Sequence, residues 1–366
     1  MSPTRGYSSY RGRSPLWKKL LAILLLLVIL AAGAVVALQN HIVYDDNGTA
    51  HLVLPGKHGG AGSAESSAGG SSSEELNITV DESSAPKELR AVQLPQTAYS
   101  QWQPDRWKSC WDGSTPFNAL VVTVKDSGGQ VFYDSAAAKA VTGRSGSETD
   151  TQALHTLMEA ASGRYLIARL SCLLDPAAAK ADMEGMGLKN TGGFIFYDGS
   201  SANWLDPAKQ KTVEYLCGLA KECAALGFHE ILLSDVSYPT AGKLDKIDYG
   251  SGVNRQETLE ALVGAVSDAL AAEYPDVKLS IELPANVITA GSDETAGLSL
   301  TAMARHVSRI WAVCAEADAP SLAQSVAAAG TDGVPGFIPE LTADVPPEQI
   351  GSALPQFLPD YLLSVR

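Results

Sequence analysis

Eight short runs of apolar residues divide the chain from about residue 90 onward, each rich in Val, Ile or Leu and without polar alternation. Strands covered on both faces form continuous apolar runs, whereas strands with one solvated face alternate apolar and polar residues. The runs are residues 91–94, 119–125, 165–172, 230–234, 278–283, 309–314, 334–341 and 361–365. This pattern predicts eight buried strands of a parallel sheet.

Between the runs, apolar residues recur at intervals of three and four, the spacing of one face of an α-helix. The clearest sets are Leu154, Leu157, Met158 and Ala161; Val213, Leu216, Leu219, Ala220, Cys223 and Leu226; and Leu259, Leu262, Val263, Val266 and Leu270. Asn254, three residues before Glu257, signals a helix start, and Pro275 favours a helix end at Tyr274. The connections between strands are therefore predicted to be helical.

Strand–helix alternation over residues 90–366 is close in length to a (β/α)8 TIM-like barrel, which typically takes about 250 residues. A doubly wound open sheet is the alternative. No glycine-rich phosphate loop follows the first predicted strand, which favours the barrel.

The first 38 residues have the pattern of a membrane anchor. Residues 1–19 contain five basic residues and no acid, and the next stretch, which opens with Leu20 and closes with Leu38, contains no charged residue. About 20 apolar residues suffice to cross a bilayer as a helix. The basic flank places residues 1–19 in the cytoplasm, residues 20–38 in the membrane and the rest outside. The alternative is a cleaved signal peptide, because small residues lie at 31–34, although its apolar region is usually only ~7–15 residues long.

Residues 39–89 are rich in Gly, Ser, Ala and Glu, including the runs at 59–63 and 69–73. Such a composition cannot bury enough apolar surface to fold by itself. It predicts a flexible linker between the anchor and the barrel.

The formal net charge is −14, and the five basic residues before position 20 leave the remainder at −19. That excess of acid argues against nucleic acid or an anionic lipid surface as the partner of the exported part.

Five cysteines (Cys110, Cys172, Cys217, Cys223 and Cys314) are widely spaced and odd in number. No C-x-x-C or Cys/His metal spacing occurs, and the six histidines show neither triad nor metal spacing. We therefore expect no disulfide framework, no metal site and no cofactor.

Several segments together resemble one known family. Its pattern W-(L/V)-D-P, followed by L-G-F-D-E-I-Q-F-D-Y-V-R-F-P, resembles Trp204-Leu205-Asp206-Pro207 and the segment LGFHEILLSDVSYP at 226–239. Further matches are NALVVTVKD at 118–126, YDS at 133–135, YLIARL at 165–170, DP at 175–176, LSIE at 279–282 and FIPEL at 337–341. The family comprises glycoside-hydrolase-like barrel domains, of unknown function, in bacterial cell-surface proteins. The resemblance implies a (β/α)8 barrel and a carbohydrate substrate, such as a cell-wall polysaccharide.

The departures from the family pattern fall at its polar positions. Thr123 stands where the second strand of the family has an acid, and Ser234 stands where the fourth strand has one. Ser237 replaces an arginine, and residues 309–316 replace the family's segment near the sixth strand. Glu282 keeps a carboxylate in place of Asp. The scaffold is retained while the polar site is altered.

Three carboxylates are candidates for catalysis. Glycoside hydrolysis generally uses two, one as the acid and one as the nucleophile or base. Glu282 ends the fifth predicted strand, on the barrel rim where active sites lie, and Glu340 lies on the seventh. Asp235 is the replacement for the acid missing at Ser234, but strand alternation directs it outward unless a bulge or the strand end turns it back. A surface acid at a strand end is the competing interpretation of each.

Four residues are candidates for binding a substrate. Arg169 on an apolar strand is costly to bury alone, so we expect it to pair with a carboxylate inside the barrel mouth. Lys125 and Asp126 end the second strand, and Trp204 either stacks on a sugar ring or packs in its loop. By contrast, Asp175 and Asp206 each precede a proline and a helical segment, which is the pattern of a helix N-cap.

Two functions follow as expectations. The first is a membrane-anchored hydrolase outside the cell that uses Glu282 with Asp235 or Glu340. The second is a catalytically inactive barrel that binds glycan or a protein partner, which the hydroxyls at Thr123 and Ser234 favour.

Overall fold

The computed structural model describes residues 42–44, 50–52, 86–95, 107, 110, 112–330 and 335–365. The chain divides into two units, Met1–Asn77 and Ile78–Arg366. In the first unit, strands β1 (Ile42–Tyr44) and β2 (Ala50–Leu52) pair antiparallel. Part of the stretch predicted as a flexible linker therefore has regular structure.

The predicted membrane anchor, residues 20–38, lies outside the described residues. Within the described part of the chain, no helix combines the length and the apolar character that a membrane span requires.

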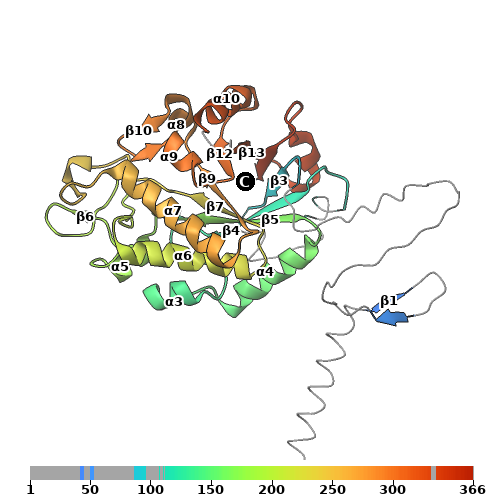
Figure 1. Ribbon diagram of the computed structural model, residues 1–366, viewed down its shortest axis with the longest axis horizontal. Helices are drawn as coiled ribbons and strands as arrows, with labels where there is room; N and C mark the ends of the chain where they lie inside the picture. Colours follow the sequence, from blue (N-terminus) through green and yellow to red (C-terminus); the bar gives the residue numbers. More distant parts are fainter. Residues whose placement is uncertain are drawn as a thin grey trace, which may run out of the picture. The chain divides into compact units, whose positions relative to one another are not determined.

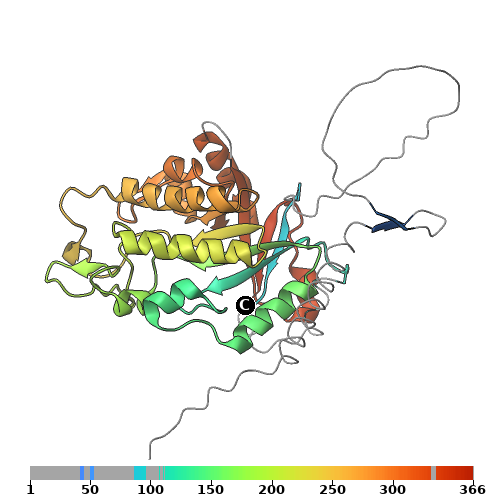
Figure 2. The same ribbon diagram turned by 60° about the horizontal axis from the view of Figure 1, so that its bottom comes forward.

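The second unit is built on a closed parallel barrel (Figures 1 and 2). Its strands are β3 (Arg90–Gln93), β4 (Ala119–Lys125), β5 (Tyr165–Ser171), β7 (Glu230–Ser234), β9 (Lys278–Glu282), β12 (Arg309–Val313), β13 (Gly336–Ala343) and β14 (Tyr361–Val365). They follow one another around the barrel in chain order, and β14 pairs with β3 to close it. Each strand overlaps one of the eight apolar runs, so the predicted barrel is confirmed and the open-sheet alternative is wrong.

Helices cover the outside of the barrel. The α-helices are α3 (Ala136–Thr142), α4 (Glu148–Ala160), α5 (Pro176–Ala181), α6 (Gln210–Ala225), α7 (Arg255–Glu273), α8 (Ala285–Ala290), α9 (Leu300–Ala304) and α10 (Ala319–Ala329). Short 3₁₀ helices are η2 (Leu244–Lys246), η3 (Glu316–Asp318) and η4 (Pro347–Ala353). The long helices α6 and α7 pack side by side (Figure 1). After β13 the described connection is the 3₁₀ helix η4 rather than an α-helix.

The sequence signals at helix ends hold in most cases. The Asn254 side chain accepts hydrogen bonds from the backbone N–H groups of Gln256 and Glu257 at the start of α7, which ends before Tyr274. Asp175 likewise caps α5. Asp206 does not cap α6, because Lys209 is the N-cap residue there and Asp206 instead accepts a hydrogen bond from the Ala208 N–H in a turn.

Two small antiparallel pairs connect loops that follow the carboxyl ends of the barrel strands. β6 (Lys189–Asn190) in the loop after β5 pairs with β8 (Ile247–Asp248) in the loop after β7. β10 (Ser292–Asp293) pairs with β11 (Leu298–Ser299) after β9. In Figures 1 and 2 the segments around β6 project at one end of the barrel. These loops surround the carboxyl-terminal mouth.

The barrel interior is a cluster of its own, separate from the larger core between strands and helices. Its members are Leu89, Ala91, Ala119, Val121, Tyr165, Ile167, Leu232, Trp311, Ile338 and Leu362. Side chains alternate along a strand, so every second residue after these also faces the barrel interior. Near the carboxyl ends of six strands the inward-facing residues are polar. Those positions are Gln93, Thr123, Arg169, Ser234, Glu282 and Glu340. The apolar layer is thus capped at the mouth by polar side chains.

A buried ion pair lies at the opposite, amino-terminal end of the barrel. Arg309 donates a hydrogen bond to Glu230, which is fully buried. Burial raises the pKa of Glu230, although the charge on Arg309 acts in the opposite direction. Tyr165 packs beside the pair and stacks on His229. The buried Glu230 at this end of the barrel therefore has Arg309 as its partner of opposite charge.

Candidate functional site

Arg169 lies at the centre of the barrel mouth. Its Nη1 donates to Gln93 Oε1 at 2.8 Å and lies 3.0 Å from Glu340 Oε2, and its Nη2 donates to Glu282 Oε2. Strand β5, which carries Arg169, pairs only with β4 and β7, whereas the three partners come from β3, β13 and β9. The contacts therefore cross the barrel, and Arg169 pairs with carboxylates inside the mouth as expected.

The mouth cluster is largely shielded from water. The side chains of Arg169, Glu282 and Glu340 are 13%, 23% and 6% exposed. Burial opposes the charge on Arg169, but the two carboxylates together raise its pKa. The pKa of Glu282 is also raised, chiefly by burial; Glu340 and Asp235 add to the effect and Arg169 opposes it. Glu282 consequently holds a proton more readily than an exposed glutamate does.

Asp235 reaches the site because the backbone turns at the end of β7. Regular alternation would point it toward the helices, since Ser234 faces inward. Its φ of 53° is left-handed, a conformation that Asp adopts more readily than most residues. Ser171 Oγ then donates to Asp235 Oδ2 at 2.5 Å.

Asp235 and Glu282 line one pocket of about 260 Å³ at the carboxyl ends of β7 and β9. The remaining lining residues are Val236, Ser237, Leu283, Pro284, Leu298 and Val313. Among the described residues that line it, two are acids and none is Lys, Arg or His. The pocket therefore combines negative charge on one side with an apolar wall on the other. Glu340 is not part of this lining and instead contacts Arg169.

The other predicted binding residues have structural contacts instead. Lys125 is fully buried; its Nζ donates to the Ser171 carbonyl at 2.7 Å and lies 3.0 Å from Asp175 Oδ2. Asp126 Oδ1 accepts from two backbone N–H groups of its own turn. Trp204 is 8% exposed and donates from Nε1 to Asp198 Oδ2 at 2.9 Å. None of these three residues lines the mouth pocket.

Gln93 and Ser171 belong to the site but were not predicted. Gln93 orients Arg169, and Ser171 holds Asp235. Both are polar residues at the last inward position of an apolar strand, and that position was the available signal. Among the described residues, no group of three or more His, Cys, Asp or Glu side chains could hold a metal ion.

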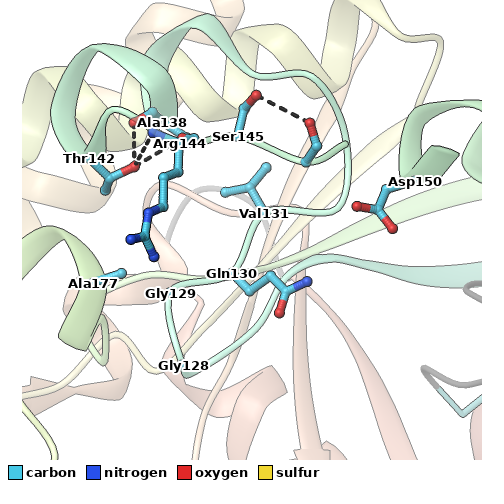
Figure 3. A pocket seen from close by; sticks show the side chains of 11 residues that line it. Gly128, Gly129, Gln130, Val131, Ala138, Thr142, Arg144, Ser145, Asp150 and Ala177 are labelled. Carbon is cyan, nitrogen blue, oxygen red and sulfur yellow. Dashed lines mark hydrogen bonds between the residues drawn. The ribbon is translucent and has the colours of Figure 1, made fainter. Parts of the chain in front are cut away.

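A second cavity of about 290 Å³ shares no lining residue with the mouth pocket (Figure 3). Its walls are the loop after β4, the turn between α3 and α4, and Ala177 of α5. Arg144 extends along this cavity toward Ala177, and Asp150 lies on another side (Figure 3). Asp150 also accepts hydrogen bonds from Ser147 in the capping box of α4. Arg144 is a cation, and Asp150 is an acid that already accepts hydrogen bonds from Ser147, so the cavity is lined by charges of both signs.

The closed barrel of eight parallel strands with helices outside places the protein in the class of TIM barrels, whose active sites lie at the carboxyl ends of the strands, where the acidic pocket is found here. The family model described as "Putative glycosyl hydrolase domain" matches residues 107–314. This match covers more than half of the chain, and the chain belongs to that family. The matched region runs from before β4 to the end of β12 and includes Arg169, Asp235 and Glu282.

Solved structures with similar folds include a hypothetical protein from Ruminiclostridium thermocellum ATCC 27405. That pair is 24% identical, with 52% of this chain and 96% of the other covered and a TM-score of 0.44. Ega3 from Aspergillus fumigatus, in complex with galactosamine, is 9% identical, with 76% and 89% covered and a TM-score of 0.39. Flavobacterium johnsoniae chitobiase is 13% identical, with 76% and 44% covered and a TM-score of 0.45. No curated protein sequence matches the chain.

Proposed function

We propose that this barrel binds carbohydrate in the mouth pocket and hydrolyses glycosidic bonds slowly or not at all. The observation that carries the proposal is the pocket walled by Asp235 and Glu282 at the carboxyl end of a barrel from a glycosyl hydrolase family. Carboxylates accept hydrogen bonds from sugar hydroxyls. Leu283, Pro284 and Val313 offer an apolar wall to the C–H face of a sugar ring.

Slow hydrolysis is expected because the mouth lacks the acids of the family pattern. Thr123 and Ser234 occupy inward positions on β4 and β7, beside Arg169 and Ser171 in the strand register. Glu282 and Glu340 are both engaged by the single guanidinium of Arg169. Two carboxyl groups that share one cation are poorly arranged to act as separate acid and base on either side of a glycosidic bond.

A hydrolase remains the second candidate, favoured by the left-handed backbone that turns Asp235 into the pocket beside Glu282. In that case Glu282, with its raised pKa, is the proton donor and Asp235 is the base or nucleophile.

Purified protein tested against polysaccharides and aryl glycosides is expected to bind at least one glycan with little turnover. Hydrogen bonds to charged groups contribute about 1.5–3 kcal/mol. Asp235→Asn and Glu282→Gln should therefore each weaken binding by about tenfold or more. Asp268→Asn, the same change at an exposed site on α7, is the matched control. Robust turnover by the unaltered protein, abolished by Glu282→Gln, would establish the hydrolase instead.

We also propose that residues 20–38 anchor the protein in the membrane with the barrel outside the cytoplasm. The basic residues before this apolar stretch support that orientation. Protease added to intact cells should release the barrel by cutting within the Gly/Ser-rich linker predicted at residues 39–89. A soluble mature protein that begins after Ala34 would contradict the anchor.

A further inference from the structure

The charges around the mouth pocket do not balance. Asp235 and Glu282 line it, and no basic residue does so among those described. Glu340 lies outside this lining, and Arg169 is the cation that contacts both Glu282 and Glu340. When the three carboxylates of Asp235, Glu282 and Glu340 are ionised, the single guanidinium of Arg169 leaves the mouth with an excess of two negative charges.

Lys125 at the carboxyl end of β4 does not correct this excess. Its ammonium pairs with Asp175, and both side chains are fully buried. The pair is neutral as a whole, and neither residue lines the pocket. The formal net charge of −14 on the whole chain adds to the negative potential.

An excess of buried or half-buried carboxylate favours a ligand that brings a positive charge. An ammonium group donates up to three hydrogen bonds, and bonds between charged partners are about twice as strong as neutral ones. A neutral sugar gains hydrogen bonds but leaves the negative charge uncompensated. An acidic sugar would be repelled by Asp235 and Glu282.

The size of the pocket limits how much of the ligand it can enclose. Its volume of about 260 Å³ is below the roughly 300–1,000 Å³ usual for pockets that hold drug-sized ligands. It has room for one ring rather than several. The charged group must therefore be on the enclosed sugar unit itself.

We propose that the mouth recognises an amino sugar with a free, protonated amine, as a unit of a deacetylated polysaccharide. This proposal rests on the proposed carbohydrate function and specifies its ligand. Asp235 and Glu282 accept the ammonium group, while Leu283, Pro284 and Val313 contact the ring.

The test compares a glucosamine oligosaccharide with its fully N-acetylated counterpart of the same length, in which a bulkier, neutral acetamide replaces each ammonium group. Calorimetry with the intact protein should show the free amine binding about tenfold or more tightly at low salt. That preference should shrink as ionic strength rises, because salt screens exposed charges. Asp235→Asn and Glu282→Gln should each reduce the preference.

Both variants keep the local geometry, since Asn tolerates a left-handed φ and Gln can still accept from Arg169. Circular dichroism and thermal unfolding should match the unaltered protein. Two controls should leave the preference unchanged: Asp268→Asn on α7, and Arg144→Ala in the second cavity (Figure 3).

The outcomes separate this proposal from the broader one. Equal binding of both oligosaccharides, lost in both variants, would overturn the charge preference and keep the carbohydrate site. Binding of neither, or tighter binding of an acidic oligosaccharide, would also overturn it. Binding of neither this pair nor any other glycan would overturn the carbohydrate function as well.

The pH profile offers an independent readout. Glu282 faces Arg169 from β5, Glu340 from β13 and Asp235 from the end of β7, and its pKa is raised mainly by burial. Affinity for the ammonium form should be lost as pH falls through that raised value, because the carboxyl group becomes neutral. Affinity should also fall at high pH, where the amine loses its proton.

Discussion

Replacing Lys125 by methionine is expected to lower the free energy of unfolding by about 3–5 kcal/mol, the usual cost of removing one partner of a buried ion pair. The Lys125 ammonium and the Asp175 carboxylate are 3.0 Å apart, and both side chains are fully buried. Without the lysine, Asp175 keeps a hydrogen bond from the Ala178 N–H, but its charge has no counterion in the described structure. The Ser171 carbonyl would also lose a donor, next to the Ser171 hydroxyl that holds Asp235.

Chemical denaturation of the two proteins measures this difference. Lys180→Met on α5 is the matched control, because Lys180 is exposed and the same change at the surface usually costs less than about 0.5 kcal/mol. A loss below about 1 kcal/mol for Lys125→Met would show that the buried pair contributes little. In that case the assignment of Lys125 to the structure rather than to ligand binding would lose its energetic support.

Restoring the family pattern with Ser234→Asp and Ser237→Arg is expected to raise glycoside hydrolysis by about 100-fold or more, the usual scale of a positioned acid or base. Ser234 faces the mouth and is the register partner of Ser171 on the neighbouring strand β5. An aspartate at this position therefore adds a carboxylate to the inner face of β7. Ser237 lines the pocket with Asp235 and Glu282, so an arginine there adds a cation to an acidic wall. Glu282 would then have a second carboxylate as its catalytic partner.

Values of kcat/KM on aryl glycosides, measured for the unaltered protein and for the double variant, test this expectation. Adding Glu282→Gln to the double variant should remove the gain, which excludes a contaminating enzyme. If the double variant folds but hydrolyses no faster, the absence of an acid at Ser234 is not what limits the reaction. The arginine should also weaken binding of an amino sugar, which links this experiment to the ligand preference proposed above.

The strand pattern of the barrel could be predicted from sequence because each strand is covered on both faces. The apolar run at 165–172, for example, became β5 almost unchanged. Arg169 within that run could also be predicted to need a carboxylate, since an unpaired buried charge is costly. Local patterning therefore predicted the strands and the kind of partner that Arg169 requires.

The residues that contact Arg169 could not be predicted, because closure of the barrel brings them together. Arg169 contacts Gln93, Glu282 and Glu340, which are 76, 113 and 171 residues away in sequence. Asp235 enters the pocket because its φ angle is left-handed, and no residue pattern in the sequence predicts that angle. The role of Lys125 could not be predicted for the same reason. A charged residue at a strand end is compatible with ligand binding and with a buried ion pair, and the sequence does not distinguish the two.

The pairing of β14 with β3 has a consequence for how the molecule is made. Leu89, just before β3, donates its N–H to Asp360, just before β14, across 271 residues of sequence. The free edge of β3 therefore stays unpaired until β14 is available. Contacts between segments so far apart in sequence slow folding. During synthesis, the barrel cannot close until β14 has left the ribosome. If the chain crosses a membrane unfolded, the barrel closes only after translocation. Until β14 is in place, the edges of β3 and β13 are open to pairing with other chains.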